Sequence, residues 1–319
     1  MSRLLTWLAV GLMVTVPLSL LAGRVWLDPL SDLSANALTI LVDLRLPRVI
    51  LAVTLGAGLG AAGAAMQGYL RNPLADPGLF GIAPGAALGA VLSFWTGWAA
   101  TAWTLPLFAL IGAAVAMALL GLIAGRTGSA MLFTLAGMMI ASLAGALMSL
   151  AISLAPSPFA MSEIVTWLMG ALTDRSWHDV SFALPLTMAG IAVLMRAGKS
   201  LDALTLGDAA ARSLGIDPRR LQGLMIVGVG LTVGAGVAAA GIIGFVGLIV
   251  PHLLRRFTDQ RPSSLILPSA LAGALLLLVA DSLCRVLPTA SELRLGIALS
   301  LLGAPFFLGL LLCMRRELA

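Results

Sequence analysis

Residues 241–261 read GIIGFVGLIVPHLLRRFTDQR, an apolar and glycine-rich run that ends in a basic cluster. The cluster follows Pro251 and consists of Arg255, Arg256 and Arg261. An apolar helix that runs into arginines is typical of a bilayer-spanning segment at the point where it meets the cytoplasm. This stretch therefore predicts a helical protein embedded in a membrane.

Composition indicates the same class for the whole chain. Hydrophobic residues make up 60% of the 319 residues, charged residues make up 10%, and the mean hydropathy is +1.05. A soluble domain carries roughly 25% charged residues, so this chain could not cover a water-exposed surface with polar groups. We predict an all-α polytopic membrane protein in which a single transmembrane domain covers residues 1–319.

Ten segments are apolar and close to the length of about 20 residues that a membrane-spanning helix needs. They lie at roughly 4–22, 49–69, 80–97, 103–124, 130–152, 180–197, 221–240, 243–257, 265–283 and 295–314. Two of them are short, and glycine or proline interrupts several. The first could also be a cleaved signal peptide, but an uncleaved helix gives the even number of spans that the charges favour.

The charge distribution predicts that both termini lie in the cytoplasm. The chain has 19 basic and 14 acidic residues, and with the N-terminus inside, 13 of the basic residues fall in cytoplasmic segments. The other six lie outside, against the positive-inside trend: Arg24, Arg45, Arg48, Arg175, Arg285 and Arg294. The basic excess marks orientation rather than nucleic-acid binding, because no basic run is interleaved with stacking aromatics.

Two motifs resemble nucleotide-binding sequences but lack the required context. The run Gly58-Leu-Gly60-Ala-Ala-Gly63 matches a dinucleotide fingerprint, yet that fingerprint needs a strand-to-helix turn, and here it lies inside an apolar helix. It forms a small-residue face for close helix packing. Gly198-Lys199-Ser200 resembles the end of a P-loop, whose first glycine would fall at Val193. We therefore expect no ATP hydrolysis by this chain itself.

The sequence also lacks the residues of a metal or redox centre. Cys284 and Cys313 form no CxxC motif, and His178 and His252 are the two histidines. Neither a zinc site nor an iron–sulfur cluster can be assembled from that inventory. We expect no catalytic residue, no bound metal and no cofactor on this chain.

A series of motifs runs in one order along nearly the whole sequence. They are Arg45-Leu-Pro-Arg48, Gln67, Arg71-Asn-Pro-Leu-Ala-Asp-Pro77, Gly81, Gly85-Ala86, Trp167-Leu-Met-Gly170, Leu206-Gly-Asp-Ala-Ala-Ala-Arg-Ser-Leu-Gly215, Gly241 to Arg255, Asp281, Arg285, Glu292, Gly296 and Gly303-Ala-Pro-Phe306. In this combination the sequence resembles the FecCD-type permeases, the membrane subunits of binding-protein-dependent ABC importers for iron chelates, haem and cobalamin. It departs from that family at Arg294, where a proline is usual, so the outer entrance to the last helix is charged rather than stiff.

The resemblance implies the architecture of a type II ABC importer permease in the bacterial inner membrane. Two copies, each with about ten transmembrane helices, would surround a central pathway. Two cytosolic ATPase subunits would carry ATP and Mg, and a periplasmic binding protein would deliver the cargo. An iron(III)–siderophore leads as cargo, with haem and cobalamin as alternatives, and no nucleic acid is implied.

On the periplasmic side, the resemblance implies that Arg45, Arg48 and Arg285 receive glutamates of the binding protein. The alternative is that they lie near lipid headgroups or pair within the subunit, for which Asp43 is a candidate partner of Arg45 or Arg48. Residues 162–172 would form the short helix of an outer gate. That helix carries Trp167 and Gly170, and Trp167 could instead be an interfacial anchor.

On the cytoplasmic side, the segment of residues 199–220 would couple to the ATPase through a pair of short helices, the first of them stopped by Gly215. The residues implied are Leu206, Gly207, Asp208, Arg212, Leu214 and Gly215. A solvated loop is the alternative. An inner gate is implied at Asn72, Pro73, Leu74, Ser129 and Ala130, with Asn72 holding a turn. A turn residue without a gating role is the alternative for Asn72.

Two other functional classes fit the sequence less well. An ion-coupled secondary transporter usually places a carboxylate or histidine inside the membrane, and Asp281 is the only deep candidate, close to the outer end of its span. A membrane-embedded enzyme would need clustered polar groups within a span, and the sequence has none.

Overall fold

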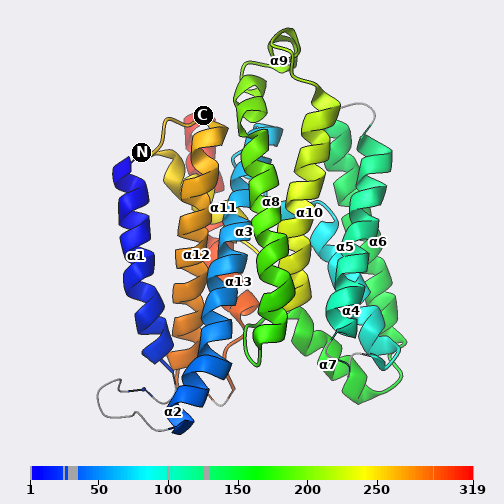
Figure 1. Ribbon diagram of the computed structural model, residues 1–319. Helices are drawn as coiled ribbons and strands as arrows, with labels where there is room; N and C mark the ends of the chain where they lie inside the picture. The colour runs from blue at the N-terminus through cyan, green and yellow to red at the C-terminus, as the bar shows by residue number, and fades with distance from the viewer. Residues whose placement is uncertain are drawn as a thin grey trace.

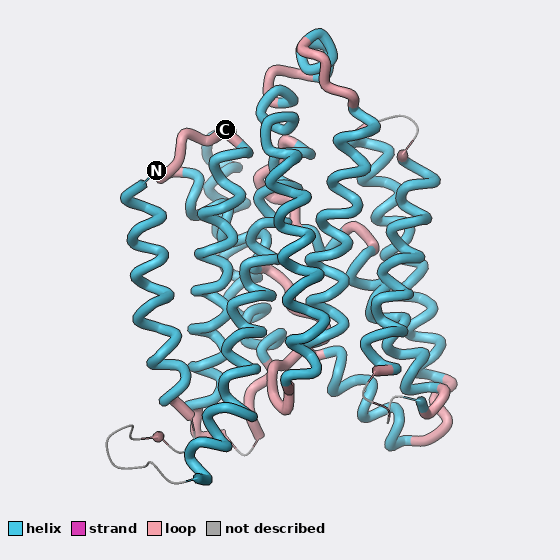
Figure 2. Tube along the Cα trace, in the orientation of Figure 1, coloured by secondary structure: helices cyan, strands magenta, loops and turns pink. Residues whose placement is uncertain are grey.

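The computed structural model describes residues 2–23, 26–27, 35–98, 101, 103–125, 129–289 and 291–318. Over these ranges the secondary structure is helical, and no strand occurs. Long helices stand side by side as one bundle, and short helices cover its two ends (Figures 1 and 2).

The described chain consists of α-helices, one π-helical turn and one 3₁₀ turn. They are α1 (Ser2–Leu21), α2 (Ala35–Thr39), a π-helical turn (Ile40–Arg45), α3 (Leu46–Leu70), a 3₁₀ turn (Pro77–Leu79), α4 (Ile82–Trp95), α5 (Thr104–Ala124), α6 (Ala130–Ser153), α7 (Pro158–Leu168), α8 (Trp177–Leu204), α9 (Asp208–Ser213), α10 (Pro218–Ala240), α11 (Val246–Arg255), α12 (Pro262–Val286) and α13 (Leu295–Leu318).

The ten predicted spans correspond to ten apolar helices. In the described ranges, eight helices are long and apolar enough to cross a membrane, while α4 and α11 are shorter apolar helices. Two predicted boundaries were wrong. The second span, expected at 49–69, continues outward to Ala37, and the sixth, expected at 180–197, covers Trp177–Leu204. Charged residues end an apolar run, but they do not end a helix that continues beyond the bilayer.

The arrangement of the ends agrees with the topology predicted from the charges. Both termini and α9 lie at one end of the bundle, and α2 and α7 lie at the other (Figure 1). The basic residues assigned to the cytoplasm therefore place the α9 end inside, and α2 and α7 lie at the outer end.

Helix α3 forms the centre of the bundle because its glycines let neighbouring backbones approach. A Cβ atom on Gly56 or Gly60 would come within 2.3 or 2.0 Å of carbonyl oxygens of α12, and one on Gly63 within 2.0 Å of the Gly247 carbonyl in α11. The packing face predicted from these glycines is confirmed. Of the span that contains α3, 83% is buried, against 6% for α1 at the edge.

Candidate functional site

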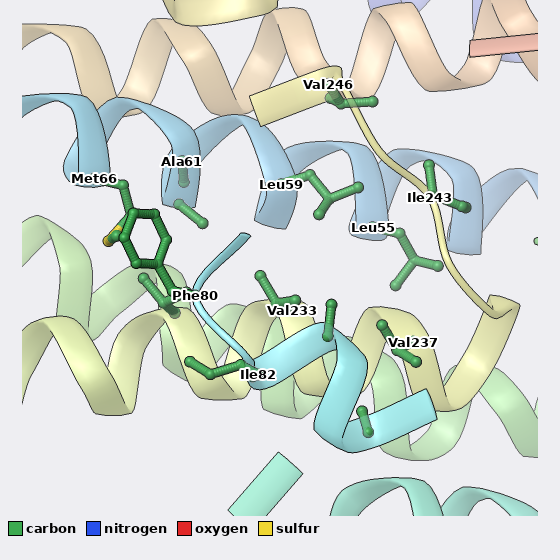
Figure 3. Packing of buried hydrophobic residues seen from close by; sticks show 14 of the residues in the cluster. Leu55, Leu59, Ala61, Met66, Phe80, Ile82, Val233, Val237, Ile243 and Val246 are labelled. Atoms are coloured by element: carbon green, nitrogen blue, oxygen red, sulfur yellow. The ribbon is translucent and has the colours of Figure 1, made fainter. Parts of the chain in front are cut away.

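An apolar cavity of about 410 Å³ lies where the helical backbone is interrupted. Helix α10 ends at Ala240 and α11 begins at Val246, so the segment 241–245 crosses this region without helical structure. Figure 3 shows Leu55 and Leu59 of α3 with Val233 and Val237 of α10 and with Ile243, all of which line the cavity. The remaining lining residues include Leu74, Pro77, Phe245 and Phe307.

A second cavity, of about 560 Å³, adjoins the first at Leu74, which lines both. Its wall also contains Asn72 and Ala130 together with residues of α6. The structure thus brings together three of the five residues predicted for the inner gate. Phe307 of α13 lines the first cavity, and residues of α6 line the second.

Local hydrogen bonds fix the shape of the turn at residues 71–75, which follows α3 and which we call the inner turn. Arg71 ends α3 in the left-handed conformation with φ 51°, and the Asn72 side-chain oxygen accepts the Leu74 N–H at 2.9 Å. Asn72 therefore holds the turn before Pro73, as predicted. Ser129 begins α6 by accepting the Leu132 N–H at 3.3 Å. Whether this turn acts as a gate stays a prediction.

The segment predicted to couple to an ATPase protrudes from the inner end of the bundle (Figure 1). It contains one six-residue helix, α9, instead of the expected pair, because α8 continues as far as Leu204. Gly215, with φ +81°, stops α9 as predicted, since its N–H bonds to the Arg212 carbonyl. Leu206 and Leu214 are 67% and 62% exposed at either side of α9.

An ion pair connects this protruding segment to the inner turn. Arg71 donates to the Asp208 carboxylate at 2.8 Å, and both side chains are largely exposed. At Gly207, with φ +100°, a Cβ atom would meet nothing within 4 Å. The backbone there is open to a partner, but its conformation suits glycine alone.

The three arginines predicted to dock a partner lie at the outer end, where they are buried. Arg45, Arg48 and Arg285 are 8%, 8% and 5% exposed. Arg45 donates to the carbonyls of Leu20 and Leu21 at 2.8 and 2.7 Å. These side chains are therefore committed within the subunit in this conformation.

Arg48 pairs with two acids of the chain, neither of which is Asp43. Its Nε and Nη2 bond to Asp281 of α12 at 2.9–3.1 Å, and its Nη1 bonds to Glu292 Oε2 at 2.9 Å. Arg285 reaches Asp281 at 3.3 Å and Ser19 at 2.9 Å. Its Nε and Nη1 are buried and find no hydrogen-bond acceptor among the described residues.

Glu292 extends this network to the linker between α7 and α8. Its Oε2 also accepts the hydroxyl of Thr173 at 2.9 Å. Burial alone would raise the pKa of the Glu292 carboxyl, but Arg48 and the Thr173 hydroxyl hold that pKa below its ordinary value of 4.5. The carboxylate is therefore charged at neutral pH.

Three glycines join the end of α7 to two other helices. A Cβ atom would lie 2.2 Å from the Ile242 carbonyl if placed on Gly170, 2.4 Å from the Trp167 carbonyl on Gly241, and 2.2 Å from the Met169 carbonyl on Gly296. The Gly296 N–H donates to the Gly170 carbonyl at 3.2 Å, and the Ala171 N–H to the Ala240 carbonyl at 2.8 Å. We name this contact of α7, α10 and α13 the glycine junction.

The short helix predicted at 162–172 is α7, which begins and ends four residues earlier than expected. Ser157 caps its start by accepting the Ala160 N–H, and Gly170, expected within the helix, lies beyond its end with φ +69°. Trp167 is buried beside Phe94, with ring centroids 6.2 Å apart. Its side chain belongs to the buried hydrophobic core, and whether it acts in a gate stays a prediction. Sequence reasoning did not connect Gly170 with Gly241 and Gly296.

No group of three or more metal-ligating side chains occurs among the described residues. Together, the apolar helices, the apolar cavity beside a break in the backbone and the helix that protrudes at the inner end are the features of a membrane transport subunit.

The particular family is given by comparison with known proteins. The model of the FecCD transport family matches residues 11–313, and the chain belongs to this family. Over 98% of this chain and 94% of the relative, it is 38% identical to the vitamin B12 import system permease protein BtuC of Vibrio vulnificus (strain CMCP6). It is 39% identical to the cobalamin permease BtuC of Halobacterium salinarum, over 86% of this chain and 74% of that protein.

The fold is similar to that of a solved ABC transporter. That structure shows an inward-facing conformation of a protein provisionally classed as a metal-chelate type ABC transporter. The two chains are 30% identical, the TM-score is 0.89, and the match covers 96% of this chain and 98% of the other. The permease fold predicted from the sequence is therefore confirmed.

Proposed function

We propose that this chain is the permease subunit of a binding-protein-dependent ABC importer and that its cargo is a corrinoid. The observation that carries the proposal is the similarity to a vitamin B12 permease over nearly the full length of both proteins. The sequence alone favoured an iron(III)–siderophore. That cargo and haem are the alternatives that the experiment below separates.

The polar groups of the structure support transport driven by separate subunits. Asp281, the deep carboxylate that an ion-coupled transporter would use, is held by Arg48 and Arg285. A carboxylate with two arginine partners is not available to bind and release a coupling ion. The cavity wall is mostly apolar, which suits passage of a bulky cargo without tight binding.

The partners follow from the two ends of the subunit. On the inner side, the exposed Leu206 and Leu214 flank α9 and offer apolar contact to a cytosolic ATPase, which would carry the ATP and Mg. On the outer side, the three arginines would receive carboxylates of a periplasmic binding protein, because a guanidinium binds a carboxylate through two hydrogen bonds. A second copy of the chain would complete the pathway in the inner membrane of a bacterium.

The cargo is tested by reconstituting the permease with its ATPase and binding protein in lipid vesicles. We expect cyanocobalamin to stimulate ATP hydrolysis and to accumulate inside the vesicles. A ferric siderophore and haem, each at the same concentration, serve as comparison cargoes. Stimulation by one of these and not by cyanocobalamin would overturn the corrinoid assignment. No stimulation by any of the three would overturn the importer itself.

A further inference from the structure

The outer end of the subunit holds two of its proposed docking arginines, Arg48 and Arg285, in internal ion pairs, and it holds Arg45 on backbone carbonyls. Arg48 is a buried cation that needs a counter-charge, because an unpaired charge in the interior costs several kcal/mol. Asp281 supplies one counter-charge from within α12, and Glu292 supplies the second from the loop between α12 and α13. Three nitrogens of Arg48 already donate to these two acids and its side chain is 10% exposed, so a partner's carboxylate would compete with Asp281 and Glu292 for the guanidinium.

The two acids differ in how easily they could be replaced. Asp281 binds Arg48 through three hydrogen bonds, also contacts Arg285, and has a side chain that is 1% exposed. Glu292 binds Arg48 through a single hydrogen bond, and its side chain is 21% exposed. Glu292 is therefore the exchangeable partner of Arg48.

We propose that Glu292 is an internal stand-in for the carboxylate of the docking partner, and that docking displaces it from Arg48 and frees Thr173. This inference rests on the proposed docking function. The exchange replaces one carboxylate on Arg48 by another, so the buried guanidinium stays paired throughout. The displaced Glu292 side chain moves toward solvent, where its charge is hydrated.

The exchange would act on the linker between α7 and α8. Thr173 lies in that linker, three residues beyond Gly170 of the glycine junction, and its hydroxyl donates to the same Glu292 oxygen that Arg48 binds. Loss of Glu292 from Arg48 removes the anchor of Thr173 as well. Docking at Arg48 thus loosens the segment that connects α7, the short outer helix, to the rest of the bundle.

The first test measures docking of the cognate binding protein to the permease in nanodiscs. Glu292→Gln removes the competing charge and leaves Asp281 on Arg48. We expect docking to become three- to tenfold tighter, because a competitor has been removed. Asp174→Asn is the matched control. Asp174 is an exposed acid in the linker between α7 and α8, next to Thr173, and its φ of +58° is a conformation that asparagine tolerates. It should change docking less than twofold.

The second test measures how accessible the linker between α7 and α8 is to a labelling reagent, and its first part needs no partner. Leu172 is buried beside Thr173, so a cysteine at position 172, in a chain without Cys284 and Cys313, should react slowly with a maleimide that does not cross membranes. We expect Thr173→Val to speed this labelling severalfold. In the chain with Thr173 intact, adding the binding protein should speed labelling to a similar degree.

The outcomes separate this inference from the function on which it rests. Absence of docking to the unchanged permease would overturn the docking function and this inference with it. Normal docking that Glu292→Gln leaves unchanged or weakens would overturn the stand-in role alone. Labelling at position 172 that neither Thr173→Val nor the binding protein accelerates would overturn the release of the linker.

Discussion

A single glutamine, Gln67 of α3, donates a hydrogen bond to a backbone carbonyl of α11 that a proline leaves without its usual partner. Pro251 has no N–H group, so the carbonyl of Gly247, four residues earlier, has no partner within the helix. The Gln67 Nε2 donates to this carbonyl at 3.4 Å and to the Leu248 carbonyl at 3.2 Å. The Gln67 Oε1 accepts from Arg255 at 2.9 Å. The Gln67 amide thus connects α3 both to the start of α11, at Gly247 and Leu248, and to its end, at Arg255.

We expect Gln67→Leu to lower the free energy of unfolding by about 1–3 kcal/mol, the usual effect of leaving buried polar groups unsatisfied. Pro251→Ala restores the missing N–H, so Gln67→Leu should have a smaller effect in that background. Thermal unfolding in nanodiscs measures both. Gln222→Leu is the matched control, because Gln222 is fully buried and its amide has no hydrogen-bond partner among the described residues. Strictly additive effects of Gln67→Leu and Pro251→Ala would contradict this role.

The sequence marked Gln67 as part of a motif but did not reveal what it binds. Its partners lie on another helix, and hydropathy carries no information about which carbonyls lack a donor. The same holds for the partners of Arg48. The sequence placed three arginines at the same end of the bundle. Its one candidate for an internal partner was the nearby Asp43, whereas Asp281 and Glu292 approach Arg48 only in the folded bundle.

At the scale of elements, the ten apolar helices were predictable because each carries its own apolar signal, although two of them, α4 and α11, are shorter than a full span. The ends were less predictable. Helix α8 continues past Arg196 and Lys199 to Leu204, since arginine and lysine are good helix formers outside the bilayer as well. The glycine junction was not predictable, because Gly170, Gly241 and Gly296 meet only through the packing of three helices.

Helix α9 and its flanks allow a test of coupling that leaves the fold intact. Leu206 and Leu214 are exposed, so replacing both by serine should change stability by less than about 0.5 kcal/mol. If they contact the ATPase, the loss of apolar contact should reduce substrate-stimulated ATP hydrolysis and uptake at least tenfold. Methionine at both positions should restore them. Normal coupling in the double serine variant would contradict the assignment. Gly207→Trp is less informative, because φ +100° strains any other residue.

Parts of α6 and α13 are left open by the other helices of the subunit. Gly145 of α6 and Gly309 of α13 would have nothing within 4 Å of an added Cβ atom. A glycine on an open helix face is about 1 kcal/mol less favourable than alanine, so its use there favours close approach by another helix. Of the two cavities that share Leu74, one is lined by Phe307 of α13 and the other by residues of α6. A second copy packed against α6 and α13 would enclose these cavities between the two subunits.

That arrangement predicts that the inner turns of two copies meet across the pathway. In a chain without Cys284 and Cys313, Leu74→Cys should form a cross-link between copies. Because Leu74 stands between the two cavities, the cross-link should block uptake, while docking of the binding protein at the outer end continues. Val14→Cys is the control, since Val14 is exposed on α1 at the edge of the bundle and should form no cross-link. Full uptake with the Leu74→Cys cross-link in place would show that the cargo does not pass this turn.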